Sequence, residues 1–129
     1  MNLELFKNLT ILYVEDEPLV QKSIGSILKR RVKKVYFANN GKDGIESFKE
    51  HLNEIDLILT DIEMPIMNGI EMIEKIKDIM DKKPIIIITA FDDDDEHNSH
   101  LADEFIVKPV KKEQLFSAIE DSVAKYNKN

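Results

Sequence analysis

The sequence contains no cysteine, so neither disulfide bonds nor thiolate chemistry contribute to its fold or function. It also lacks an apolar run long enough to cross a bilayer, and its first residues, MNLELFKN, lack the basic-then-apolar pattern of a secretory signal. We therefore expect a cytoplasmic protein without membrane insertion. The net charge of −7 argues against direct nucleic-acid binding by this domain.

Short apolar runs alternate with longer amphipathic stretches along the 129 residues, enough for one compact domain. The runs are rich in Ile and Val without polar alternation, as in strands buried on both faces of a parallel sheet. Apolar residues recur at helical spacing between them, and Asn68 is placed to cap one helix. This pattern predicts a doubly wound α/β domain with helices on both faces. The predicted strands are 9–14, 35–38, 57–59, 85–88 and 105–107.

The helix between the fourth and fifth predicted strands is the exception. Residues 92–104 offer only Leu101 and Ala102 as apolar positions. Asp, Asn, Ser and His each cost roughly 0.5–0.7 kcal/mol relative to Ala inside a helix. We therefore expect this fourth helix to be short or frayed.

The same segment contains an acidic run at residues 92–96, followed by His97 and His100. This composition is compatible with a metal site. However, the two histidines are three positions apart, and no third ligand is fixed nearby. We interpret the segment as a solvated acidic loop.

Chemically active residues follow four of the predicted strands. Glu15 and Asp16 follow the first strand, and Asp61 follows the third. Thr89 follows the fourth and Lys108 the fifth, and ligands in open α/β sheets bind outside these carboxyl ends. Two carboxylates 4 Å apart repel by about 4 kcal/mol at an effective dielectric near 20, so the acids need a cation. Mg²⁺, a carboxylate, a lysine and a hydroxyl are the parts needed for phosphoryl transfer to an aspartate.

Four stretches of the chain resemble the receiver domain of two-component response regulators. They occur in the family's order and near its separations, and together they span nearly the whole chain. The resemblance implies a flavodoxin-like, five-stranded parallel sheet of order 2-1-3-4-5. It also implies a single receiver domain over residues 1–129, with a core at about 8–126 and no output domain in this chain. The stretches are YVEDEP (13–18), LILTDIEMPIMNG (57–69), IIIITAF (85–91) and EFIVKP (104–109).

The resemblance also implies a role for each site residue. Asp61 would be the phosphoacceptor, and Lys108 and Thr89 would each hold a phosphoryl oxygen. Thr89 and Phe105 would form the switch, and the Lys108–Pro109 peptide would be cis. The cofactor would be Mg²⁺, with Mn²⁺ as an alternative. The implied metal ligands are Glu15 (through water), Asp16, Asp61 and the backbone carbonyl of Glu63.

The implied function is a signalling switch that turns over no free metabolite. A sensor histidine kinase or a phosphotransfer protein would supply the phosphoryl group. The modified domain would then change its affinity for a downstream protein target or for an effector domain outside this chain. One alternative is a receiver-like module that binds its partner constitutively. Another is an Asp-dependent phosphohydrolase, suggested by Asp61-Ile62-Glu63, although those enzymes place their acidic pair after the first strand and need a substrate-enclosing cap.

The chain departs from the family at several positions. Lys108 follows Thr89 by 19 positions, a few fewer than usual, and Leu101 stands where Gly commonly precedes an Ala-Asp pair. Both changes fall at the fourth helix, which argues against a standard dimer through that face. Glu63 and Phe91 lie at the rim of the expected site. We expect both to alter the rate at which water attacks the acyl phosphate, with Phe91 slowing it by exclusion.

Overall fold

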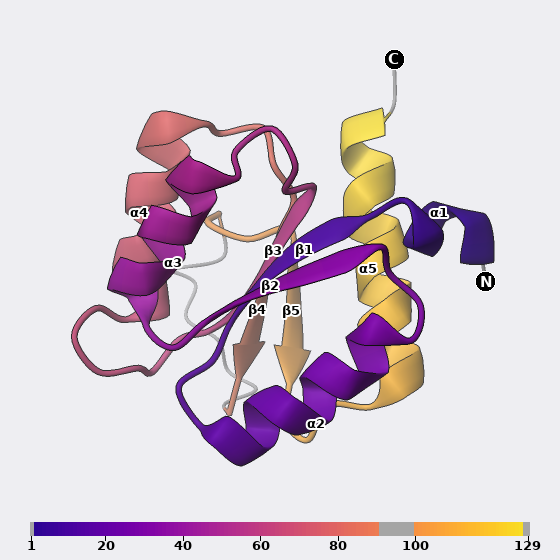
Figure 1. The fold of residues 1–129 in the computed structure, drawn as a ribbon, viewed down its shortest axis with the longest axis horizontal. Coiled ribbons are helices and arrows are strands. Elements are labelled where there is room, and N and C mark those ends of the chain that lie inside the picture. The colour runs from indigo at the N-terminus through magenta and orange to yellow at the C-terminus, as the bar shows by residue number, and fades with distance from the viewer. Residues whose placement is uncertain (1, 91–99, 128–129) are drawn as a thin grey trace.

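Five parallel strands form the central sheet of this computed structural model, which describes residues 2–90 and 100–127 (Figure 1). The strand order is β2-β1-β3-β4-β5, so the predicted fold class and strand order are confirmed. The strands are β1 (Thr10–Val14), β2 (Lys34–Ala38), β3 (Leu57–Asp61), β4 (Ile85–Thr89) and β5 (Glu104–Val107).

Helices cover both faces of the sheet (Figure 1). One face packs against α2 (Pro18–Lys29), α5 (Lys112–Asn127) and the short α1 (Leu3–Lys7). The other face packs against α3 (Gly41–Glu50) and α4 (Gly69–Ile79). Within the described part of the chain, no helix has the length and apolar content to span a membrane.

Local sequence signals explain where the helices begin. Pro18 opens α2, where the missing N–H of proline costs nothing. The side chain of Asn40 caps α3 by accepting from a backbone N–H at 2.9 Å. Asn68 caps α4 in the same way, also at 2.9 Å, which confirms the cap predicted at this residue.

The core consists of one buried apolar cluster on each face of the sheet. Successive residues of a strand point to opposite faces. Ile11 and Tyr13 therefore belong to the cluster under α2 and α5. Leu12 and Val14 belong to the cluster under α3 and α4. This alternation explains why β1 is apolar throughout.

Helix α1 is an element that the sequence pattern did not predict. Its cap, Asn2, accepts from the N–H of Leu5 at 3.1 Å. Phe6 is fully buried, and its ring lies 5.1 Å from that of Phe116 on α5. Helix α1 and the C-terminal end of α5 both line a cavity where the strands begin (Figure 1). Asp61 is the last residue of β3 and therefore lies at the opposite end of the sheet.

The connection from β4 to β5 is described only at Ala90 and residues 100–103, which form turns and bends without a helix. Leu101 is buried in the cluster under α3 and α4, and His100 is exposed. The acidic run and His97, together with most of the fourth helix predicted here, lie outside the described residues.

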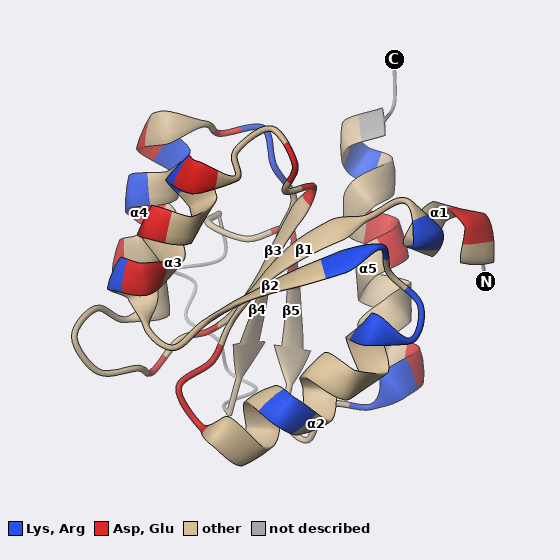
Figure 2. Ribbon diagram, viewed as in Figure 1, with Lys and Arg blue, Asp and Glu red and all other residues tan. Residues whose placement is uncertain are grey.

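Basic residues are concentrated at the turn between α2 and β2 (Figure 2). Five of the 18 basic residues fall within residues 29–34. Most of them are exposed, and this turn lies where the strands begin. The loop from β1 to α2, at the other end of the sheet, is acidic (Figure 2).

Candidate functional site

Three carboxylates meet at the C-terminal ends of β1 and β3. Glu15, Asp16 and Asp61 each offer an oxygen that lies within 4.8 Å of the other two. Strand pairing brings them together, because Val14 at the end of β1 lies beside Thr60 of β3. Glu15 and Asp61 are buried, at 1% and 6% exposed, whereas Asp16 is half-buried. The structure thus groups the three acids that the sequence placed at strand ends.

Lys108 supplies the cation beside this cluster. Its Nζ donates to Oδ2 of Asp61 at 2.7 Å, while Oδ1 accepts from the N–H of Ile62 at 2.7 Å. Burial opposes the charge of Lys108, but the hydrogen bond to Asp61 and the charges of Asp61 and Glu15 outweigh it. The pKa of Lys108 is therefore raised, and the side chain stays cationic.

Glu15 is the least solvated of the three acids. Its Oε2 accepts from the N–H of Glu17 at 3.2 Å, whereas its buried Oε1 has no hydrogen-bond partner among residues 2–90 and 100–127. Burial is the main cause that raises the pKa of Glu15 to about 7. The Glu17 N–H and Lys108 act against this increase, while Asp61 and Asp16 add to it.

The donor set fits a divalent cation that prefers oxygen ligands. A buried carboxyl oxygen without a donor is unfavourable, and a cation beside it removes that cost. The three carboxylates offer the oxygen ligands that Mg²⁺ prefers, and the half-buried position of Asp16 leaves room for the waters that this ion usually keeps. The residues present therefore suit the ion expected from the sequence.

Thr89 and Lys108 are held together by the pairing of β4 with β5. The carbonyl oxygen of Thr89 accepts from the N–H of Lys108 at 2.8 Å, and Thr89 lies beside Val107. The peptide between Lys108 and Pro109 is cis, as expected. Thr89 is buried at the strand end, and Phe105 is half-buried against the cluster under α3 and α4. Their switch roles stay predictions.

The loop from β3 to α4 is anchored directly on Asp61. A side chain on Gly69 would collide with the carbonyl oxygen of Asp61, so only glycine allows this approach. The N–H of Gly69 donates to the carbonyl of Ile62 at 2.7 Å. Ile66 at the tip has φ of 69° and is 77% exposed, a strained conformation for a β-branched residue.

The two residues predicted at the rim have different outcomes. Glu63 is exposed two residues after Asp61, and its roles as a carbonyl ligand and as a modulator of water attack stay predictions. Phe91 lies outside the described residues.

Sequence reasoning missed two residues near the site. Nε2 of Gln21 donates to the carbonyl oxygen of Glu15 at 3.0 Å. It also donates to the carbonyl of Ala38 at 3.3 Å and to Oδ1 of Asn39 at 3.1 Å, which ties two site loops together. The second residue missed is Tyr13, whose side chain is fully buried in β1. A polar residue in a helix and an aromatic in a strand gave no separate sequence signal.

An apolar groove of about 570 Å³ opens beside Lys108, between α2 and the segment that follows β5. Leu19 at its rim is 83% exposed. The groove is lined by Leu19, Val20, Ser23, Ile24, Lys108, Pro109 and Val110.

The chain is similar to known receiver domains in both sequence and structure. The family model of the response regulator receiver domain matches residues 11–120. Chemotaxis protein CheY from Treponema pallidum is 34% identical over 113 residues, which cover 84% of this chain and 78% of CheY. The solved structure of response regulator protein TrrA from Thermotoga maritima in complex with Mg²⁺-BeF is 27% identical, with a TM-score of 0.75. That match covers 88% of this chain and 97% of TrrA.

Other relatives are much longer than this chain. The protein-glutamate methylesterase/protein-glutamine glutaminase of Desulfotalea psychrophila is 35% identical over 113 residues. The match covers 82% of this chain but only 30% of that protein. This chain therefore spans less than a third of the length of several curated relatives.

Proposed function

Since the chain belongs to the response regulator receiver domain family, we propose that it is a phosphoacceptor switch in which Asp61 accepts a phosphoryl group. The observation that supports this most directly is the setting of the Asp61 carboxylate. It lies 2.7 Å from the ammonium of Lys108 and within the group of three acids. The donor would be a histidine kinase or a phosphotransfer protein of the cytoplasm.

In the proposed transfer, one carboxylate oxygen of Asp61 attacks the phosphorus atom of a phosphohistidine. The new O–P bond forms as the P–N bond breaks, and the imidazole nitrogen keeps the electron pair. Lys108 stabilises one phosphoryl oxygen as a point charge, and the hydroxyl of Thr89 donates to another. Both residues lie at adjoining strand ends, which suits this division of roles.

The proposal includes Mg²⁺, with Mn²⁺ as an alternative, held by Asp16, Asp61 and, through water, Glu15. The backbone carbonyl of Glu63 would complete the protein ligands. When bound, the ion supplies positive charge that offsets the carboxylates and the phosphoryl oxygens. The likeness to TrrA, whose structure was solved in complex with Mg²⁺-BeF, supports this assignment.

The apolar groove beside Lys108 suits the approach of the donor. Leu19 at its rim is exposed, and Val20, Pro109 and Val110 line it. An amphipathic helix can place its apolar face in such a groove. We assign the groove to docking of the phosphodonor protein.

The proposed output is a shift between two packings of the domain. The phosphoryl group attracts the hydroxyl of Thr89, and Phe105 packs inward as Thr89 moves. The surface formed in this way binds a downstream protein target or an effector domain. The domain over residues 1–129 acts as one receiver and turns over no free metabolite.

Intact-mass measurement after incubation with Mg²⁺ and acetyl phosphate tests the proposal. Wild type should gain one phosphoryl group, and Asp61→Asn should gain none. Asp78→Asn removes an exposed acid of α4 and should behave as wild type. A gain that persists in Asp61→Asn would refute the site, and no gain on wild type would favour a module that binds its partner constitutively.

A further inference from the structure

The hydroxyl of Tyr13 is a buried polar group that the proposed phosphoryl transfer does not use. Tyr13 is 0% exposed, and its oxygen has no hydrogen-bond partner within the described ranges, 2–90 and 100–127. Buried polar groups are nearly always hydrogen-bonded, so each exception needs an explanation. An unpartnered hydroxyl next to a binding site suggests a partner that is present in another state.

Strand geometry directs Tyr13 and Glu15 to the same side of the sheet. The N–H of Glu15 donates to the carbonyl of Ala38 at 3.0 Å, so the ladder between β1 and β2 continues through Glu15. Residues two apart in a strand point to the same face. Tyr13 and Glu15 therefore lie next to each other, below the group of three acids.

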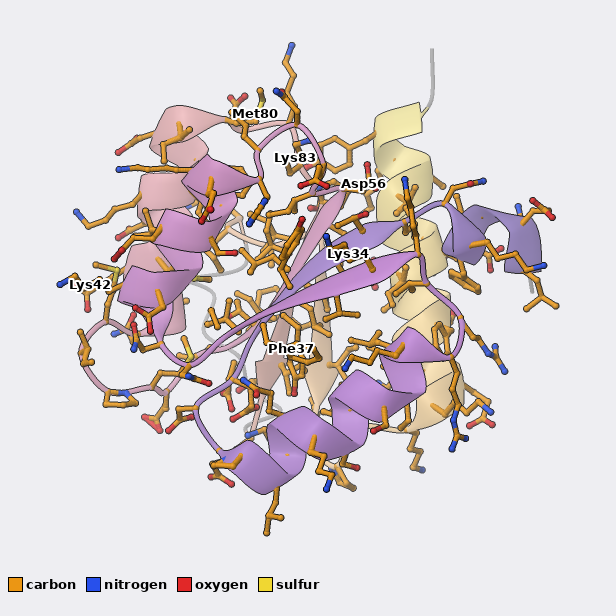
Figure 3. The ribbon with its side chains drawn as sticks, viewed as in Figure 1. Lys34, Phe37, Lys42, Asp56, Met80 and Lys83 are labelled. Carbon is orange, nitrogen blue, oxygen red and sulfur yellow. The ribbon has the colours of Figure 1, made fainter. Side chains whose placement is uncertain are left out.

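The ring of Tyr13 is held in place by its neighbours. It meets the ring of Phe37 edge-on, with centroids 6.2 Å apart and an interplanar angle of 61°. Phe37 lies between β2 and α2 (Figure 3), where its ring fills the space above Gly25. Burial raises the pKa of Tyr13, and the charges of Glu15 and Asp61 raise it further, as expected for a hydroxyl close to both carboxylates.

Glu15 offers one oxygen that could receive this hydroxyl. Its Oε2 already accepts from the N–H of Glu17, whereas Oε1 is buried without a partner among the residues that the structure describes. A carboxylate that ligates a metal is in turn usually hydrogen-bonded by a neighbouring group. The two unpartnered atoms, one donor and one acceptor, are complementary.

We propose that Tyr13 positions Glu15 for the metal ion by donating its hydroxyl to Oε1 of Glu15, directly or through one water, when the ion is bound. This inference rests on the proposed function, because it presupposes the Mg²⁺ site. It assigns a role to a residue of β1 that lies below the ligands.

The test compares Mg²⁺ affinity with stability in Tyr13→Phe, which keeps the aromatic ring and removes only the hydroxyl. Titration calorimetry with MgCl₂ should show an affinity about tenfold weaker than that of wild type. Without divalent ions, the melting temperature should stay the same or rise, because the hydroxyl has no partner to lose among residues 2–90 and 100–127. Tyr36→Phe is the matched control. It removes a surface hydroxyl that donates to Glu54 at 2.7 Å and should keep wild-type affinity.

A spectroscopic measurement gives a second readout. The chain has three tyrosines and no tryptophan, so in the double variant Tyr36→Phe, Tyr126→Phe the ultraviolet absorbance reports on Tyr13. Addition of MgCl₂ should shift this absorbance if the hydroxyl gains a hydrogen bond.

The outcomes separate the inference from the proposed function. Equal Mg²⁺ affinity of wild type and Tyr13→Phe would overturn the inference alone. Parallel loss of stability and affinity in Tyr13→Phe would also overturn it, since that result indicates a purely structural role. A wild type that binds no Mg²⁺ would overturn both.

Discussion

At Glu15, burial of the side chain and binding of a cation place opposite demands on one carboxyl group. Its buried position favours the neutral form and raises its pKa to about 7. A metal ligand must instead be ionised. Near neutral pH the group is therefore divided between both forms in the absence of metal, and a cation shifts it toward the carboxylate.

This conflict predicts how stability depends on pH without metal. The folded state binds a proton at Glu15 with a pKa of about 7, against an ordinary value of 4.5. The resulting stabilisation is fully present below pH 4.5 and is lost as pH rises toward 7. Glu15→Gln mimics the neutral carboxyl group, so this variant should keep the stabilisation as the pH rises. Urea unfolding in EDTA from pH 4.5 to 8 should therefore show that the free energy of unfolding of wild type falls relative to that of Glu15→Gln as the pH rises.

The exposed acid Glu46 of α3 offers the control for this measurement. For Glu46→Gln, the free energy of unfolding should change with pH in parallel with that of wild type. If Glu15→Gln also ran parallel to wild type throughout, burial of Glu15 would not control its protonation.

Among the elements, α1 depends on a single anchor. It has five residues, too few to be stable as an isolated helix, and Phe6 is its only buried side chain. Phe6→Ala should lower the free energy of unfolding by about 3–5 kcal/mol, because it leaves a cavity against Phe116. Urea denaturation measures the change.

Leu3→Ala is the control within the same helix. Leu3 is 55% exposed, so its truncation should change the free energy of unfolding by no more than about 0.5 kcal/mol. Equal losses in both variants would show that α1 is not attached through Phe6.

The strength of local patterns determines which elements could be predicted. Unbroken runs such as Ile85–Ile88 indicated strands buried on both faces, and the structure has β4 there. Asn68 and the helical spacing after it indicated α4. Helix α1 has only five residues, too few to establish a helical period. The residue that Phe6 contacts, Phe116, lies near the other end of the sequence.

At the scale of the whole molecule, topology explains why the site could be anticipated. Asp61 ends β3 and Lys108 follows β5, and a parallel sheet places the carboxyl ends of all its strands at one edge. The sequence could not indicate which carboxyl oxygens lack partners. It also could not show that Gln21 links two loops, since this depends on the distance between β1 and β2 at their ends.

Mg²⁺ should stabilise the whole fold, because the site exists only in the folded chain. At a concentration about ten times its Kd, the ion should raise the free energy of unfolding by about 1.4 kcal/mol. Urea unfolding at pH 8, where Glu15 is mostly ionised, measures the gain. NaCl at equal ionic strength and the variant Asp16→Asn should both give a much smaller gain. An equal gain from NaCl would show general screening of the negative charge instead of a site.

Helix α1 and the C-terminal end of α5 lie where the strands begin (Figure 1). Asp61, the last residue of β3, lies where the strands end. A strand of five residues is about 17 Å long. In the proposed switch, a rearrangement that starts at Asp61 reaches Phe105 across β4, whereas α1 and the C-terminal end of α5 lie about a strand length away. Helix α5 begins at Lys112, close to Lys108, so its first turns lie near the site while its C-terminal end and α1 do not. We therefore expect a partner to sense the proposed switch most strongly at the sheet edge that holds Asp61.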